Sequence, residues 1–201
     1  MDKIETISPL EVKKYFLLAN ALKDRARHHK QLGIGVLEEE YKRELDWLNR
    51  LDDERLSARI TDKVRLKRYD SMKWKAGIKL LENAGVWPKM QGSHISLTTE
   101  NVPETARLIE ESIKINSGKV PEELRAKIES IRELSDFIYS GFPLIFFPGG
   151  EVREKDYNVW AKENNQPLCN IYDFDIDDGC TRAIAYSLEG IKESSVLFGE
   201  Y

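Results

Sequence analysis

Tyr172-Asp-Phe-Asp-Ile-Asp-Asp178-Gly-Cys-Thr-Arg182-Ala-Ile-Ala-Tyr-Ser-Leu188-Glu-Gly190 joins the signals of a strand, a tight turn and a helix in one short run. From 172 to 176, aromatic and β-branched residues alternate with aspartates, which is typical of a half-buried strand. Asp178-Gly179 predicts a turn, and the residues from Arg182 onward have helical periodicity up to a glycine at the usual helix end. A strand at 195–198 follows. This order directs backbone N–H groups and a guanidinium toward one point, which favours an anion, most often phosphate.

The run from Asp178 to Ala185, with Gly190 and the closing strand, resembles the ParB/sulfiredoxin superfamily. In this loop ParB-type domains carry Gly-Glu-Arg-Arg, free serine kinases Asp-Gly-His-His-Arg, and sulfiredoxins Gly-Cys-His-Arg. Residues 133–147 look like the helix, glycine and apolar strand that precede the loop in that family. The resemblance covers roughly residues 120–201. It implies a loop that binds a nucleotide or phosphate, formed here by Gly179, Cys180, Thr181 and Arg182. The alternative is that Gly179 only makes a turn and that Arg182 pairs with Asp178.

Charge, hydropathy and cysteine content limit the classes of protein to which this chain can belong. The 201 residues are 33% charged with a formal net charge of −4, which argues against a basic coat for nucleic acid but leaves room for local basic patches. No apolar run approaches the roughly 18 residues of a membrane span, and the first residues lack the apolar core of a signal peptide. Two cysteines, Cys169 and Cys180, suit a reducing compartment. We therefore expect a soluble, cytoplasmic protein without a membrane partner.

The predicted fold class is α+β, with an N-terminal helical region at 1–91 and a ParB/sulfiredoxin-like domain with a small mixed β-sheet at 92–201. Helical periodicity and caps divide the first region into segments at 8–32, 36–56, around 60, and from 71 to 84. The second region is expected to hold a short strand at 94–97, helices at 103–115 and 121–140, a buried strand at 142–147 and an insertion at 151–170.

The aspartates of the opening stretch are candidates for metal binding and catalysis. Asp173, Asp175 and Asp177 fall on one face of the predicted strand, and Asp178 lies in the turn. Carboxylates beside a phosphate site could hold Mg²⁺, for which Asp177 and Asp178 are the candidate ligands. Asp178 matches the Asp-Gly of the free serine kinases and is the candidate catalytic residue. The alternative is a solvent-facing row of charges that only confers solubility.

Cys180 stands where sulfiredoxins have their nucleophile, and a helix N-terminus favours a reactive thiolate. Position 181 is threonine, however, where the sulfiredoxin loop has histidine. A small, buried cysteine within the phosphate-binding loop is the alternative.

One stretch of the chain is basic. Between Arg59 and Lys79 there are eight Lys or Arg residues against two Asp. Such residues could contact a nucleic-acid backbone. The candidates are Arg65, Lys67, Arg68, Lys73 and Lys75. A charged, solvated helix face is the alternative.

Three hypotheses about function follow. The first is a nucleotide- or phosphate-binding module that acts on or beside DNA, as the ParB branch of the resemblance implies. The second is a small Mg²⁺-dependent phosphotransferase or nucleotide hydrolase that uses Asp178. The third is a non-catalytic interaction scaffold. In the first two, the expected cofactor is a nucleoside triphosphate or diphosphate with Mg²⁺.

Overall fold

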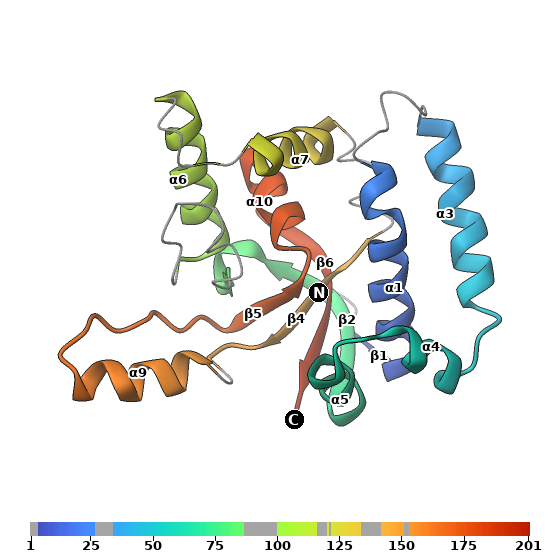
Figure 1. Ribbon diagram of the computed structural model, residues 1–201, viewed down its shortest axis with the longest axis horizontal. Coiled ribbons are helices and arrows are strands. Elements are labelled where there is room, and N and C mark those ends of the chain that lie inside the picture. Colours follow the sequence, from blue (N-terminus) through green and yellow to red (C-terminus); the bar gives the residue numbers. More distant parts are fainter. Residues whose placement is uncertain are drawn as a thin grey trace.

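A six-stranded mixed sheet lies at the centre of the computed structural model, in the order β1-β2-β6-β4-β5-β3 (Figure 1). The structure describes residues 4–26, 34–86, 100–115, 120, 122–133, 142–150 and 153–201. The strands are β1 (Glu5–Ile7), β2 (Lys73–Leu80), β3 (Ala84–Gly85), β4 (Leu144–Pro148), β5 (Phe174–Asp178) and β6 (Glu193–Glu200). The pairs β4–β6 and β3–β5 are parallel, and the other neighbours are antiparallel.

Helices cover both faces of this sheet. On one face, α1 (Pro9–Ala26), α4 (Asp53–Arg59) and α5 (Lys63–Ser71) pack together, and α3 (Ile34–Leu48) lies beside α1. The other face carries α6 (Val102–Lys114), α7 (Glu122–Glu133) and α10 (Cys180–Leu188), and the short 3₁₀ turn η1 (Leu81–Asn83) follows β2. Strand β4 contributes Leu144 and Phe146 to one core and Ile145 and Phe147 to the other. Its unbroken apolarity thus reflects burial on both faces, as predicted.

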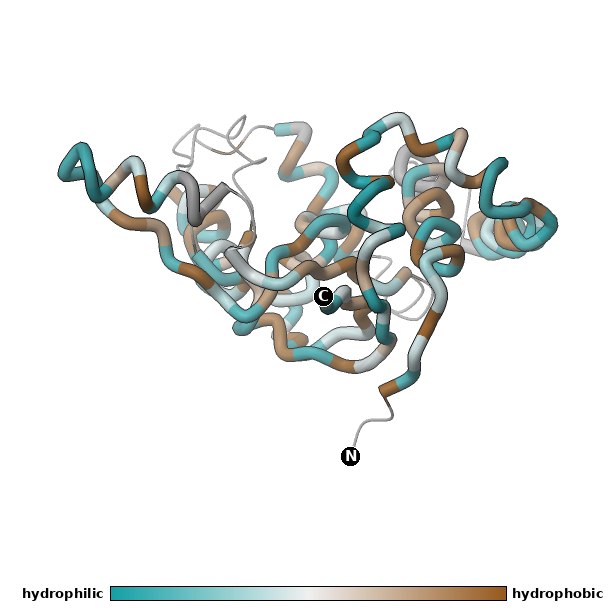
Figure 2. Tube along the Cα trace, turned by 90° about the horizontal axis from the view of Figure 1, so that it is seen from below, coloured by the Kyte–Doolittle hydropathy of each residue, from teal (hydrophilic) through white to brown (hydrophobic). Residues whose placement is uncertain are grey.

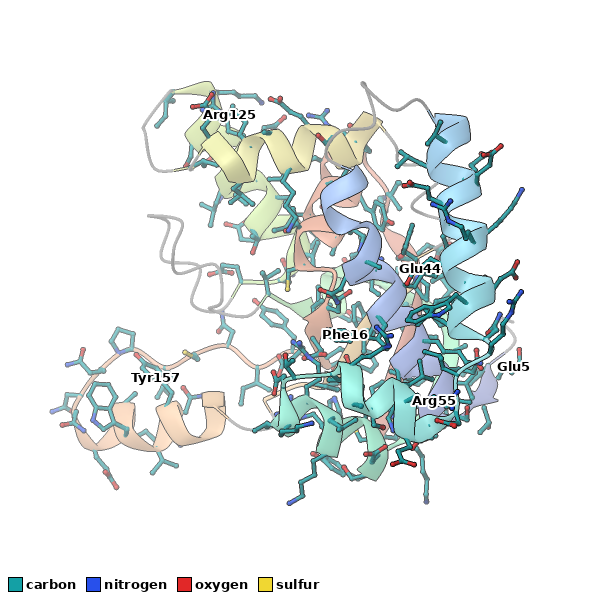
Figure 3. The ribbon with its side chains drawn as sticks, turned by 45° about the vertical axis from the view of Figure 1, so that its right-hand side comes forward. Glu5, Phe16, Glu44, Arg55, Arg125 and Tyr157 are labelled. Carbon is teal, nitrogen blue, oxygen red and sulfur yellow. The ribbon has the colours of Figure 1, made fainter. Side chains whose placement is uncertain are left out.

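One element leaves the body of the molecule. Helix α9 (Arg153–Glu163) and the chain that returns from it to β5 extend away from the layers (Figures 1 and 2). Figure 3 shows Tyr157 out on this projection, whereas Phe16 of α1 lies at the body. This is the predicted insertion at 151–170. None of the helices within the described residues is both long and apolar enough to cross a membrane.

The α+β class is confirmed, but the predicted all-helical character of residues 1–91 is wrong, because β1, β2 and β3 all lie there. The predicted helix from 71 is strand β2, which pairs with β6 from Lys73–Glu200 to Leu80–Glu193. Trp74 and Ile78 are four residues apart, so they fit a helix face as well as one face of a strand. The predicted regions 1–91 and 92–201 share one sheet.

Several other predicted elements are confirmed. The helix at 103–115 is confirmed as α6. The strand before Gly179, the helix after it and the closing strand are confirmed as β5, α10 and β6. The expected helix at 36–56 is divided into α3 and α4, because Asp52 caps α4 by accepting the Arg55 N–H at 2.9 Å. The short strand at 94–97 lies outside the described residues, as does the end of the helix expected at 121–140.

Candidate functional site

Gly179 forms the turn between β5 and α10. It is the N-cap residue of α10, its φ is +99°, and as a glycine it makes no side-chain capping bond to this helix. A Cβ atom here would lie 2.5 Å from Leu144 Cδ2 and 3.0 Å from Arg182 Nη2. Both the left-handed backbone and the close neighbours therefore require glycine, which confirms the predicted turn.

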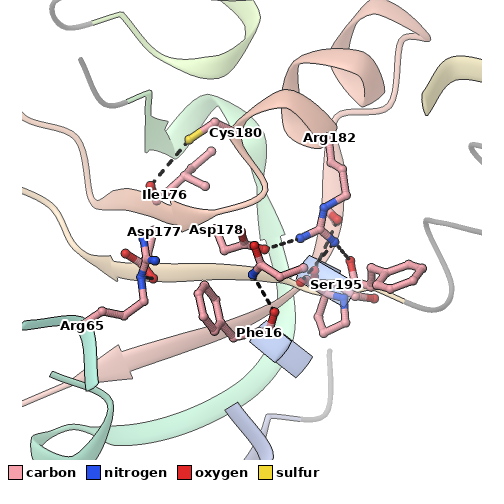
Figure 4. Close-up of polar contacts among 12 residues, drawn as sticks. Phe16, Arg65, Ile176, Asp177, Asp178, Cys180, Arg182 and Ser195 are labelled. Atoms are coloured by element: carbon pink, nitrogen blue, oxygen red, sulfur yellow. Dashed lines mark hydrogen bonds and ion pairs between the residues drawn. The ribbon is translucent and has the colours of Figure 1, made fainter. Parts of the chain in front are cut away.

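The Arg182 guanidinium lies against this turn and is bonded within the protein (Figure 4). Nη2 donates to Asp178 Oδ2 at 2.7 Å, and Nη1 donates to the carbonyl oxygen of Phe142 at 2.6 Å. The side chain of Arg182 is 11% exposed and that of Asp178 is 24% exposed. Arg182 therefore already holds an anionic oxygen, that of Asp178, at the start of α10.

Asp177 belongs to a separate cluster that joins β5 to α5. Its Oδ2 accepts a hydrogen bond from Arg65 Nε at 2.8 Å and another from the Tyr69 hydroxyl at 2.7 Å. The Asp177 side chain is only 5% exposed, and the Arg65 guanidinium also lies 4.7 Å from the centre of the Phe16 ring. A buried carboxylate with a cation and a hydroxyl as partners forms a structural link between residues 112 apart in the chain.

Burial and the negative charge of Asp177 together shift the pKa values of Tyr69 and Arg65. Burial raises the pKa of the Tyr69 hydroxyl well above its ordinary value, and the negative charge of Asp177 raises this pKa further. Burial alone would lower the pKa of Arg65, but the charge of Asp177 and the hydrogen bond to it outweigh burial and raise that pKa. At neutral pH Tyr69 is therefore a neutral donor and Arg65 a fixed cation.

Tyr69→Phe should lower the free energy of unfolding at pH 7 by about 1.5–3 kcal/mol, the usual range for a hydrogen bond to a charged group. An unfolded tyrosine titrates near pH 10, and the pKa in the folded protein is higher. The stabilisation from neutral Tyr69 is thus complete below about pH 10 and is lost as the pH rises toward the folded-state pKa. Chemical denaturation from pH 7 to 11.5 should show a flatter alkaline decline in Tyr69→Phe than in the parent.

Tyr157→Phe is the matched control for this substitution. The Tyr157 hydroxyl donates to the Pro167 carbonyl oxygen at 3.2 Å on the exposed projection. Its loss should change stability at pH 7 by less than about 0.5 kcal/mol. Equal losses in the two variants would mean that the bond to Asp177 contributes nothing specific.

The predicted metal ligands do not converge. Asp177 is held by α5 and Asp178 by α10, and successive strand residues point to opposite faces. In the part of the chain that the structure describes, no group of three His, Cys, Asp or Glu side chains is placed to hold a metal ion. Asp175 accepts the Gly150 N–H at 2.9 Å and is 5% exposed. Of the three aspartates on the predicted strand, only Asp173 is exposed, as the alternative of a solvent-facing row of charges expects.

The other two residues of the predicted loop lie in the first turn of α10. Cys180 is partly buried and its Sγ lies 3.6 Å from the carbonyl oxygen of Ile176 (Figure 4). Thr181 is also partly buried. This placement fits the alternative of a small cysteine packed within the loop.

The predicted nucleic-acid residues are not gathered into one free basic surface. Arg65 is bonded to Asp177, Arg68 lies 4.4 Å from the centre of the Phe147 ring, and Lys75 forms an ion pair with Glu200 at 2.7 Å. Lys67 on α5 and Lys73 on β2 are exposed. Three of the five predicted residues therefore contact other groups of the protein itself.

Comparison with known proteins gave no relatives. No protein-family model matches the chain, and neither a curated protein nor a solved structure matches it. The resemblance to the ParB/sulfiredoxin superfamily thus stays a prediction.

Proposed function

We propose that the turn at Gly179 and the Arg182 guanidinium form a phosphate-binding site, through which the protein binds a nucleotide. One observation supports this proposal above the others. At the N-terminus of α10, where the N-cap glycine makes no side-chain capping bond, Arg182 holds a carboxylate oxygen of Asp178 at 2.7 Å. Phosphate oxygens have the same hydrogen-bonding chemistry as this carboxylate. Asp178 is then an internal stand-in for the phosphate.

Binding would be an exchange of anions. The Asp178 side chain is 24% exposed, so it can turn toward solvent while phosphate takes its place on Arg182. A phosphate carries more negative charge than a carboxylate, and the positive end of the α10 dipole favours it further. The second bond of Arg182, to the Phe142 carbonyl oxygen, keeps the guanidinium oriented throughout. Because one ion pair replaces another, we expect a modest intrinsic affinity for phosphate alone.

Arg182→Ala should weaken binding by about 1.5–3 kcal/mol, or roughly 10- to 150-fold, because a charged hydrogen-bond donor to the ligand is lost. The measurement is calorimetric titration with inorganic phosphate and with ATP, ADP, CTP and GTP in the presence of Mg²⁺. Arg132→Ala is the matched control, because Arg132 is a half-exposed arginine paired with Glu189 at the opposite end of α10. Equal affinities of the parent and Arg182→Ala would refute the site.

Asp178→Asn separates binding from catalysis. If Asp178 competes with the ligand for Arg182, the neutral amide should tighten phosphate binding, by about tenfold for 1.4 kcal/mol of relieved competition. If Asp178 is instead a magnesium ligand or a catalytic base, the same variant should lose Mg²⁺-dependent nucleotide binding or turnover. Thermal unfolding of each variant shows whether the fold survives the change.

A further inference from the structure

The projection around α9, residues 153–173, is held together at its base and in its middle (Figure 1). At the base, the Gly150 N–H donates to Asp175 Oδ2 at 2.9 Å. In the middle, Asn158 of α9 pairs with both backbone groups of Cys169: its Nδ2 donates to the carbonyl oxygen at 3.0 Å, and its Oδ1 accepts the N–H at 2.7 Å. Side chains on this support have little conformational entropy left to lose when they bind a ligand.

The tip of the projection is a capped helix end. Asn165 has a φ of +52°, and the Gln166 N–H donates to the Ala161 carbonyl oxygen at 2.8 Å. This is the arrangement of a Schellman cap, in which a residue in the left-handed conformation ends the helix. The Asn164 N–H still donates to the Trp160 carbonyl oxygen at 3.0 Å. The helical spacing of side chains therefore extends to Asn164.

Tyr157, Trp160 and Asn164 share one side of this helix. At 3.6 residues per turn, these three positions fall within about 60° of one another. The ring centres of Tyr157 and Trp160 are 5.7 Å apart, and the two residues are 37% and 50% exposed. Val159 is also exposed, but it lies about 160° around the helix from Tyr157. Two neighbouring aromatic rings therefore stand in water on one side of the projection.

Hydrogen bonds to the backbone orient the polar groups around these rings. The Tyr157 hydroxyl donates to the Pro167 carbonyl oxygen at 3.2 Å, Asn164 Nδ2 donates to the Trp160 carbonyl oxygen at 2.7 Å, and Gln166 Nε2 donates to the Asn164 carbonyl oxygen at 3.3 Å. Both amide side chains are exposed, and the described residues offer no donor to either amide oxygen. Each amide can therefore still accept a hydrogen bond and donate a second one.

The charges beside the rings disfavour an anionic ligand. Glu163 is exposed and follows Trp160 by three residues, so the two are neighbours on the helix surface. Lys162 lies about 160° around the helix from Trp160. Among the described residues of α9, a nucleic-acid backbone would thus meet a carboxylate beside the rings and not a cation. A carboxylate does accept hydrogen bonds from hydroxyl groups.

The size of the surface disfavours a protein partner. From the usual areas of these side chains, the exposed parts of Tyr157 and Trp160, with those of the half-exposed Leu168 and Ile171 on the returning chain, amount to on the order of 300 Å². A standard protein interface covers roughly 800 Å² on each partner. One or two small rings are enough to cover the aromatic pair.

We propose that Tyr157 and Trp160 bind a neutral oligosaccharide, whose flat sugar rings stack on them. The amides of Asn164 and Gln166 and the Glu163 carboxylate then bond the sugar hydroxyls. A sugar ring with equatorial hydroxyls has an apolar C–H face for the aromatic ring and an edge that both donates and accepts hydrogen bonds. The 5.7 Å between the ring centres is close to the length of one sugar residue. Successive residues of a β-1,4-linked glucose or N-acetylglucosamine chain can therefore contact both rings.

Trp160→Ala and Tyr157→Ala should each weaken oligosaccharide binding at least about tenfold, the loss typical of an aromatic ring on which a ligand stacks. Tyr157→Phe keeps the ring and should retain most of the affinity. The measurement is NMR titration of the ¹⁵N-labelled full chain with cellopentaose and with chitopentaose up to 20 mM, because an open site of this size should have a dissociation constant on the order of 1 mM. The Trp160 indole signal, identified by its absence from the Trp160→Ala spectrum, should shift in the parent.

Two variants are matched controls. Val159→Ala removes an exposed apolar side chain from another side of the same helix, and Tyr201→Ala removes an aromatic one, 73% exposed, at the end of the chain. Both should bind like the parent, and unchanged signals from the β-sheet show that each variant is folded.

Three results would overturn the proposal. The first is a parent whose Trp160 indole signal shifts with neither sugar at 20 mM. The second is a loss of binding in Val159→Ala as large as that in Trp160→Ala. The third is tighter binding of a short oligothymidylate than of both sugars, which would assign the rings to a single-stranded nucleic acid. The site is separate from the proposed phosphate site, so Arg182→Ala should leave sugar binding unchanged.

Discussion

Arg65→Met should lower the free energy of unfolding by about 3–5 kcal/mol, the largest loss that we expect from any single side chain. The substitution removes the cation but leaves Asp177, whose side chain is 5% exposed, with the Tyr69 hydroxyl as its one remaining partner among the bonds described above. A buried carboxylate without its cation is far less stable than one in water. Urea denaturation at pH 7 measures the loss.

Two comparisons isolate the cause of this loss. Arg55→Met removes a 70% exposed arginine that lies 3.7 Å from Asp52, and should change stability by less than about 1 kcal/mol. The double variant Arg65→Met/Asp177→Asn removes both charges and should recover at least half of the loss, because no uncompensated charge remains buried. A loss in Arg65→Met no larger than that in Arg55→Met would show that the pair does not join α5 to β5.

The Asp177 cluster also shows where sequence reasoning stops. Asp178 and Arg182 are four residues apart, so their pairing across one helix turn was available as the structural alternative for Arg182. Arg65 and Asp177 are 112 residues apart, and no local pattern joins them. Arg65 therefore looked like part of a basic stretch, and Asp177 like part of a row of acids. Only the packing of α5 against β5 makes them partners.

The same distinction holds for the fold. The segment from β5 through α10 to β6 was predictable, because its turn glycine, helix period and strand alternation are all local. Strand β2 was mistaken for a helix, although Lys73-Trp-Lys-Ala-Gly-Ile-Lys-Leu80 alternates charged or small residues with apolar ones over part of its length. Its strand character is decided by pairing with β6, more than a hundred residues away. The projection around α9 was predicted as an insertion, but the contacts of Asn158 and Asp175 that hold its returning chain are not revealed by sequence spacing.

Gly179→Ala should destabilise the protein by about 2–6 kcal/mol, for two separable reasons. A non-glycine residue at a φ of +99° strains the backbone by about 1–3 kcal/mol. In addition, the new Cβ would lie 2.5 Å from Leu144 Cδ2 in the core, and relieving such overpacking costs about 1–3 kcal/mol. Thermal and urea denaturation of the variant measure the sum of the two.

Gly190→Ala separates these two effects, because Gly190 has a φ of +77° but nothing lies within 4 Å of the position of its Cβ. It should show the backbone strain alone, and the difference between the two variants is then the cost of crowding Leu144 and Arg182. That difference also bears on phosphate binding, since the Cβ at 179 would lie 3.0 Å from Arg182 Nη2 and would displace the guanidinium from Asp178. If the two alanine variants are equally stable, the close approach at Gly179 is not what fixes Arg182, and the bonds to Asp178 and to the Phe142 carbonyl oxygen must hold it alone.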